Sequence, residues 1–115
     1  MLTEAFQIAL DDCDQVFLSV DVDVVDPGMA PGTGTPEPGG LTGRQLLDAV
    51  RRIAISVPLA GIDVVEVSPP YDQAEVTAFL GNRVVLEALS GIAWRRRQLA
   101  GDPVRRPDAP LLEGR

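Results

Sequence analysis

The 115-residue chain contains no histidine, and all ten of its basic residues are arginine, so lysine is absent as well. Its single cysteine, Cys13, excludes a disulfide within the chain and is compatible with a reducing compartment. Neither a signal peptide nor an apolar run long enough to cross a bilayer is evident in the sequence. These absences predict a cytoplasmic protein that does not associate with a membrane.

Aromatic residues make up only 4% of the chain, whereas aliphatic residues are ample, so an aliphatic core is possible if it finds partners to pack against. The length is that of one small domain. The formal net charge is −7, and it is unevenly distributed: residues 1–94 hold fourteen acidic residues against four arginines, and residues 95–115 hold three against six. A net negative charge argues against nucleic-acid binding and suits a site that receives cationic ligands.

The stretch from Val16 to Leu41 organises the rest of the chain. It opens with an apolar run that is typical of a buried parallel strand, and it continues to Asp21 and Asp23. Residues i and i+2 of a strand point to the same face, so these carboxylates are predicted to project together at the strand's C-terminal end, where α/β sheets bind ligands. Two adjacent acids repel each other unless a cation neutralises them or one of them keeps its proton. Carboxylate pairs of this kind suit Mn²⁺ or Mg²⁺. In the alternative interpretation they only cap backbone or pair with arginine.

A second alternative is phosphoryl-transfer chemistry. An apolar strand ending in D-x-D resembles the nucleophile strand of haloacid-dehalogenase-type phosphatases, in which the first Asp, here Asp21, attacks phosphorus. That family also needs a lysine beyond the strand. Because this chain has no lysine, the phosphatase interpretation is disfavoured.

The loop after the strand and a segment farther along the chain carry a closer resemblance. The loop contains APGTGTP at residues 30–36 and GGL at residues 39–41, and the later segment reads GIDVVEVSPPYD at residues 61–72 and AEVTA at residues 74–78. Together with Ser19-x-Asp21-x-Asp23 and Asp26-Pro27, these segments resemble the ureohydrolase (arginase/agmatinase) family. The second segment favours the agmatinase-like branch. The resemblance covers about residues 16–94.

The resemblance implies a hydrolase in which two Mn²⁺ ions activate water to cleave a guanidino compound into urea and an amine. It implies that Asp21 and Asp23 are metal ligands and that Thr35 and Glu66 line the guanidinium pocket, and it assigns no further catalytic residue to this chain. A carboxylate such as Glu66 can hold a guanidinium through charge-assisted hydrogen bonds. Without the motif, Glu66 would be read as an acid at a strand end that a nearby arginine satisfies. Agmatine is the first expected substrate and a guanidino acid the second.

The chain also departs from the family. Complete ureohydrolases have an upstream D-x-H-x-D segment and further histidines, none of which is present here, and Gln73 stands where a histidine is common. We therefore expect the chain to be the C-terminal portion of a three-layer α/β fold with a parallel sheet. Residues 1–94 would belong to the ureohydrolase domain and residues 95–115 would form a flexible Arg/Pro-rich tail. We expect it to be inactive alone, and to form a homo-oligomer or require a complementary N-terminal half. The alternative is a non-catalytic relic that binds a full-length homologue.

Hydrophobic periodicity predicts three helices and two strands. The expected ranges are a short helix capped by Thr3, a strand from Val16 to Val22, a helix from a Thr42–Gln45 capping box to about Ile55, a strand from Ala60 to Val67 and a helix from Ala74 to Arg96. In the last helix the side chains expected to face mostly inward are Val76, Phe79, Leu80, Val84, Leu86, Leu89 and Ile92. Since two strands leave open sheet edges, the isolated chain is expected to be marginally stable, sticky or assembled with a partner.

Overall fold

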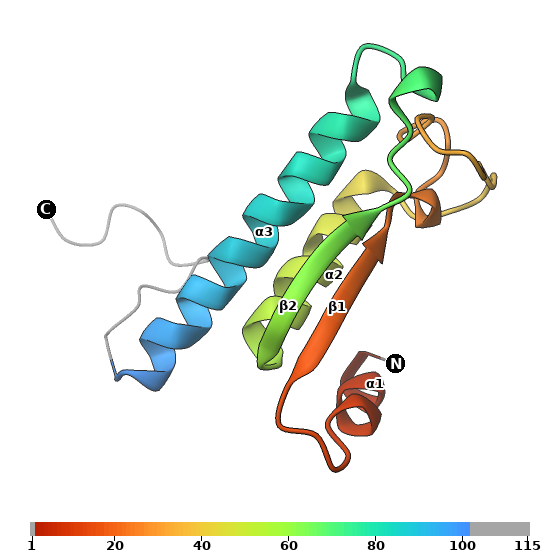
Figure 1. The fold of residues 1–115 in the computed structure, drawn as a ribbon. Coiled ribbons are helices and arrows are strands. Elements are labelled where there is room, and N and C mark those ends of the chain that lie inside the picture. The colour runs from red at the N-terminus through yellow and green to blue at the C-terminus, as the bar shows by residue number, and fades with distance from the viewer. Residues whose placement is uncertain (1, 102–115) are drawn as a thin grey trace, which may run out of the picture.

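The structure is a computed structural model that describes residues 2–101. Its elements are α1 (Leu2–Ala9), β1 (Val16–Asp21), the 3₁₀ turn η1 (Val22–Val24), α2 (Gly43–Ser56), β2 (Leu59–Val65), the 3₁₀ turn η2 (Pro69–Tyr71) and α3 (Val76–Leu99). Strands and helices alternate along the chain, and β1 and β2 pair in parallel (Figure 1). The predicted α/β class with a parallel sheet is therefore confirmed. Thr3 lies inside α1 and does not cap it.

Within residues 2–101 the sheet has two strands. They run in register from Phe17 opposite Gly61 to Asp21 opposite Val65. The carboxyl ends of both strands therefore lie at the same end of the sheet. In the described part of the chain each strand therefore has one edge with no strand beside it. Such edges present unpaired backbone N–H and C=O groups to whatever lies next to them.

The core lies between one face of the sheet and the pair of helices α2 and α3. It consists of Val20, Val25, Ala30, Leu46, Val50, Val84 and Ala88. On the other face of β1, Phe17 is 61% exposed, because side chains alternate across a strand and no described element covers that face. The sheet is therefore covered by helices on one side within the described residues.

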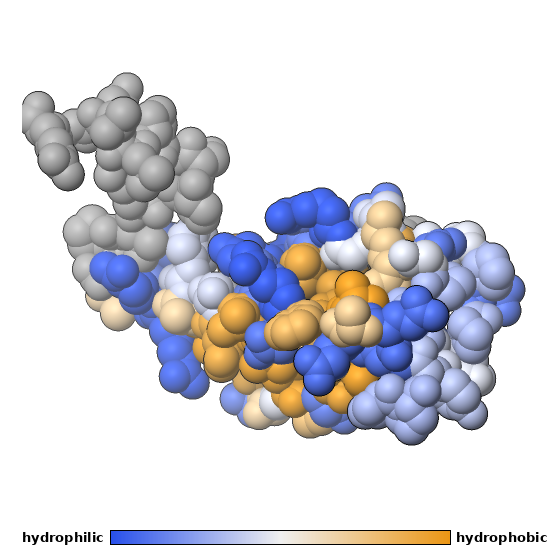
Figure 2. Space-filling model, turned by 90° about the horizontal axis from the view of Figure 1, so that it is seen from above, coloured by the Kyte–Doolittle hydropathy of each residue, from blue (hydrophilic) through white to orange (hydrophobic). Residues whose placement is uncertain are grey.

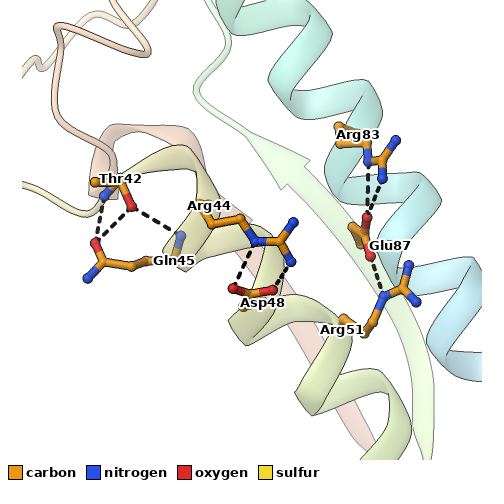
Figure 3. Close-up of polar contacts among 7 residues, drawn as sticks. All are labelled: Thr42, Arg44, Gln45, Asp48, Arg51, Arg83 and Glu87. Atoms are coloured by element: carbon orange, nitrogen blue, oxygen red, sulfur yellow. Dashed lines mark hydrogen bonds and ion pairs between the residues drawn. The ribbon is translucent and has the colours of Figure 1, made fainter. Parts of the chain in front are cut away.

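The N-terminus of α2 follows the sequence pattern. The hydroxyl of Thr42 accepts a hydrogen bond from the backbone N–H of Gln45, and the Gln45 side chain accepts one from the N–H of Thr42 (Figure 3). This reciprocal arrangement satisfies two donors that the first turn of a helix leaves without partners. The predicted capping box is confirmed, and α2 ends at Ser56, just before Pro58.

An ionic cluster around a buried carboxylate joins α2 to α3. Glu87 of α3 is 3% exposed and is bound by Arg51 of α2 and by Arg83 one helical turn earlier (Figure 3). Burial alone would raise the pKa of the Glu87 carboxyl, but the hydrogen bonds from the two guanidinium groups outweigh it and lower that pKa below its usual value. The cluster therefore holds a charged carboxylate between the two helices.

The inward face of α3 differs from the prediction. Val84 is fully buried, but Val76, Phe79, Leu86 and Leu89 are between 44% and 63% exposed, so the expectation was wrong for these four. α2 and β2 contact the side of α3 that carries small residues: a Cβ added to Gly91 would lie 2.6 Å from the Cβ of Ala54. Close approach along this side leaves the larger apolar side chains outside.

Among the described helices, α3 also carries the most exposed large apolar residues. Figure 2 shows hydrophobic residues grouped on the face of the molecule seen there. The exposed large apolar residues of α3 are Val76, Phe79, Val85, Leu86, Leu89 and Leu99. By length and composition α3 passes the test for a membrane-crossing helix, which the sequence inspection did not anticipate, although core helices of soluble proteins pass the same test.

The bounds of α3 also differ slightly from the prediction. Ala74 and Glu75 have φ values of 51° and 58°, so the right-handed helix begins only at Val76. At its other end α3 continues to Leu99, beyond the predicted Arg96. The rest of the predicted tail, residues 102–115, lies outside the described residues.

Candidate functional site

Asp21 and Asp23 lie at the carboxyl end of β1, but they are not presented by strand alternation as predicted. β1 ends at Asp21, and the next three residues turn as η1. Asp21 caps this turn, because its Oδ1 accepts a hydrogen bond of 3.1 Å from the backbone N–H of Asp23. The two carboxylates therefore come from a strand end and from the turn that follows it, and both are half-buried.

The loop between η1 and α2 returns to this turn at Thr35. The Thr35 hydroxyl donates a hydrogen bond of 2.8 Å to Oδ2 of Asp23, twelve residues earlier. Two residues before it, Thr33 is 3% exposed, and its Oγ1 accepts a long hydrogen bond of 3.5 Å from the backbone N–H of Thr35. The structure therefore brings together Asp21, Asp23 and Thr35, three of the four residues predicted to form the site.

The loop is closed at its base by Asp26. One oxygen of its carboxylate accepts a hydrogen bond from the N–H of Gly39 at 2.9 Å and the other accepts one from the N–H of Gly28 at 2.8 Å. These two backbone donors lower the pKa of the Asp26 carboxyl. Beside them the backbones of Val25 and Leu41 form a parallel bridge. The start and end of the loop are thereby held together.

The middle of the loop is fixed to the segment after β2 and to the first turn of α3. The N–H of Gly32 donates to Oγ1 of Thr77 at 2.8 Å, and its carbonyl accepts from the N–H of Ser68 at 2.7 Å. Asp72 lies against Gly32 and accepts hydrogen bonds from the backbone N–H groups of Gln73, Thr77 and Ala78. Burial opposes ionisation of Asp72, but these donors outweigh it and lower the pKa of its carboxyl.

Glu66 is the first residue after β2, so it lies at the same edge of the sheet as Asp21 at the end of β1. Its φ is 67°, a left-handed conformation that is uncommon for residues other than glycine and that recurs at functional sites. The side chain is exposed, and within residues 2–101 it makes no hydrogen bond or ion pair. The described part of the chain therefore offers no arginine that satisfies Glu66.

The donor set at this edge fits part of a metal site. Oδ1 of Asp21 and Oδ2 of Asp23 take part in the hydrogen bonds described above, and the other oxygen of each carboxylate is left for a further ligand within residues 2–101. Carboxylate oxygens are ligands that suit Mn²⁺. No group of three or more potential metal ligands occurs among the described residues. Two aspartates thus fit a metal ion, but they supply only a fraction of its ligands.

Three residues that shape the site were not singled out in the sequence as site residues: Asp26, Asp72 and Thr77. Asp26-Pro27-Gly28 was recognisable as a turn, and an Asp shortly before a helix is typical of an N-terminal cap. The contact of Asp72 and Thr77 with Gly32, in contrast, joins residues 40 or more positions apart. No local sequence pattern predicts a contact between residues so far apart in the chain.

The chain is similar to proteins named as an agmatinase, a proclavaminate amidinohydrolase and a formimidoylglutamase. It is 43% identical over 86 residues to the agmatinase of Chromobacterium violaceum, which covers 75% of this chain and 26% of the relative. It is 50% identical over 82 residues to the proclavaminate amidinohydrolase of Streptomyces clavuligerus, which covers 71% and 26%. The crystal structure of formimidoylglutamase from Bacillus subtilis superimposes with a TM-score of 0.75 at 41% identity, over 79% of this chain and 28% of that one.

These matches show the family and the share of its relatives' length that the chain spans. The chain spans about a quarter of the length of the curated relatives it matches. The expected arginase-type α/β fold is confirmed by the structural similarity. The profile of the arginase family matches residues 1–91, and the chain belongs to that family.

Proposed function

We propose that this chain carries part of the active site of a manganese-dependent ureohydrolase that cleaves a guanidino compound to urea and an amine. The observation that carries the proposal is the hydrogen bond from Thr35 to Asp23, which joins the loop to the carboxylate pair. Membership of the arginase family supports the class of reaction. Asp21 and Asp23 would hold metal, and Thr35 and Glu66 would contact the guanidinium.

The residues of the chain suit these roles chemically. A bound Mn²⁺ pair would lower the pKa of water and so supply a nucleophile at neutral pH. Glu66, exposed at the neighbouring strand end, can bind a planar guanidinium through paired charge-assisted hydrogen bonds. The Thr35 hydroxyl occupies Oδ2 of Asp23 and so restricts the orientation of that carboxylate. Binding and orientation are what this chain would contribute.

The remaining metal ligands and the residues that read the rest of the substrate would come from a complementary N-terminal portion. Two features support such a partner. Each strand has an open edge within the described residues, and an apolar groove runs along β1 and α2. The groove is lined by Leu18, Ser19, Val20, Asp21, Val24, Leu46, Ala49, Val50 and Ile53. A further parallel strand added to β1 would cover it. We also propose that the assembled protein acts in the cytoplasm, as a homo-oligomer.

Agmatine is the proposed substrate, with a guanidino acid such as guanidinobutyrate second. The relatives named above differ in what their names say they act on, so family membership leaves the substrate's tail open. Turnover of agmatine would place the protein in polyamine metabolism.

Mn²⁺ titration tests the metal assignment. The chain is mixed with the portion of the Chromobacterium violaceum agmatinase that lies outside the 86 matched residues, and Mn²⁺ binding is followed by electron paramagnetic resonance. We expect tight binding in the mixture and weak binding by either part. Asp21→Asn and Asp23→Asn should each weaken it by about tenfold or more, in line with the loss of a charged ligand. Asp48→Asn, which removes an exposed carboxylate on α2, is the control and should bind as the unsubstituted chain does.

The alternative is a non-catalytic relic that binds a full-length homologue. The exposed apolar residues of α3 and the open strand edges favour a binding role of some kind. In that case the chain would associate with a full-length agmatinase whether or not Mn²⁺ is present, and Asp23→Asn would leave both the association and the metal content unchanged.

A further inference from the structure

Thr77 connects α3 to the loop that carries Thr35. Its Oγ1 accepts the N–H of Gly32 at 2.8 Å, and Thr77 is fully buried, so water does not compete for this bond. The carbonyl of Gly32 accepts from Ser68, so both backbone groups of one loop residue are bound to the segment after β2. Leaving the buried N–H of Gly32 without an acceptor would cost free energy. We call this hydrogen bond from Gly32 to Thr77 the anchor of the loop.

Asp72 fixes the position of Thr77 and closes the space around Gly32. Its Oδ1 accepts the N–H of Thr77, and its Oδ2 accepts the N–H of Ala78, both at 3.0 Å. A Cβ added to Gly32 would lie 2.6 Å from both Cβ and Cγ of Asp72. The loop backbone is thus held against the N-terminus of α3 at a single register, and only glycine fits there.

The anchor lies three residues before Thr35. Three residues of chain span at most about 10 Å, so the position of Gly32 limits where the Thr35 hydroxyl can reach. Thr33, between the two, is 3% exposed and has little freedom of its own. At the end of this short tether Thr35 donates to Asp23. A contact on α3 therefore bears on the orientation of a predicted metal ligand.

We propose that Thr77 and Asp72 are positioning residues, which set the loop through Gly32 so that Thr35 meets Asp23. The metal-related consequence of this role depends on the function proposed above. The geometric part, the link from Thr77 to Asp23, does not depend on it. Neither residue touches substrate or metal in this proposal, and both act through Gly32 and Thr35.

The test is nuclear magnetic resonance on the full 115-residue chain, with amide chemical shifts and hydrogen exchange as readouts. Thr77→Val keeps the shape of the side chain and removes the acceptor, whereas Thr77→Ser keeps the hydroxyl. Glu87→Gln removes a buried carboxylate between α2 and α3, away from the loop, and is the control for a general loss of stability. We expect Thr77→Val to accelerate exchange of the Gly32 amide by about ten- to a hundredfold relative to Glu87→Gln.

The same Val variant should shift the amide resonances of Thr35 and Asp23, and Thr77→Ser should leave them as in the unsubstituted chain. If the Asp23 and Thr35 resonances stay unchanged in Thr77→Val, the positioning role is wrong. Should the Val variant fail to fold, Asp72→Asn is measured instead, with exchange of the Gly32 amide and the resonances of Thr35 and Asp23 as the two readouts. This substitution weakens the hydrogen bonds that Asp72 accepts from Thr77 and Ala78 and keeps the shape of the side chain. Mn²⁺ is then added to the unsubstituted chain mixed with the complementary portion. Failure of Mn²⁺ to broaden the Asp21 and Asp23 resonances would count against the proposed function and leave the amide result standing.

Discussion

The hydroxyl of Thr35 lies 2.8 Å from Oδ2 of Asp23 and donates a hydrogen bond to it. This bond is exposed, so it contributes little to folding, yet it fixes one oxygen of a carboxylate in the 3₁₀ turn that follows β1. Its loss is therefore expected to change the orientation of the Asp23 carboxylate more than the stability of the fold. A substitution at Thr35 can therefore separate an effect on binding from an effect on stability.

Thr35→Val should therefore change binding much more than folding. We expect the free energy of unfolding to fall by less than about 1 kcal/mol, since the lost bond is solvent-exposed. Mn²⁺ or guanidinium affinity of the complemented protein should fall by about tenfold, equivalent to about 1.4 kcal/mol. Urea denaturation and calorimetric titration measure the two quantities. Thr35→Ser, which retains the hydroxyl, is the matched control, and equal losses in both variants would refute the role of the hydroxyl.

The Glu87 cluster makes a prediction about pH. Because the folded pKa of Glu87 is lowered, its ion pairs stabilise the fold at pH values above its usual pKa of 4.5. That contribution is lost as the pH falls through the lowered folded pKa. Glu87→Gln should cost about 1–3 kcal/mol at pH 7, and the difference from the unsubstituted chain should shrink in acid.

Urea denaturation of both proteins between pH 7 and pH 3 measures that difference. The control is Asp48→Asn, which breaks the exposed i,i+4 pair with Arg44 and should cost less than about 1 kcal/mol. A difference between Glu87→Gln and the unsubstituted chain that stays constant over this pH range would show that the cluster does not act through its charge.

The approach of α2 to α3 predicts the effect of a single methyl group. Gly91→Ala would place a Cβ 2.6 Å from the Cβ of Ala54 and 3.1 Å from the carbonyl oxygen of Arg51, so the helices must move apart. The gain in helix propensity is about 1 kcal/mol, and overpacking costs about 1–3 kcal/mol, so we expect a net loss of stability. Thermal unfolding measures it. Gly34→Ala, which meets no atom within 4 Å, should have the melting temperature of the unsubstituted chain; a Gly91→Ala chain that melts at or above this temperature would contradict the close packing.

Local patterns in the sequence were reliable where local chemistry determines the structure. The Thr42–Gln45 capping box formed as expected, since a cap depends on four consecutive residues. The position of Asp23 was not predictable in the same way, because the strand ends at Asp21 and a 3₁₀ turn follows. Alternation along a strand holds only as far as the strand extends.

The face of α3 was misjudged for a related reason. Its apolar residues surround the helix, so periodicity alone does not tell which of them a neighbour covers. The small residues Gly81 and Gly91 decided it, since they allow β2 and α2 to come close. The link from Thr77 to Gly32 depends on the tertiary fold and is visible only in the structure. The exposure of Leu86 and Leu89 is consistent with a chain that spans about a quarter of its relatives.

The measurement that tests the central claim most directly is urea release from agmatine. The chain is combined, in the presence of Mn²⁺, with the portion of the Chromobacterium violaceum agmatinase outside the 86 matched residues. We predict urea from the mixture and none from either part, with Glu66→Gln and Asp23→Asn each reducing the rate at least a hundredfold, or about 2.7 kcal/mol. A stable complex that binds Mn²⁺ but releases no urea from agmatine or guanidinobutyrate would contradict the assignment of this chain to a guanidino-hydrolase active site.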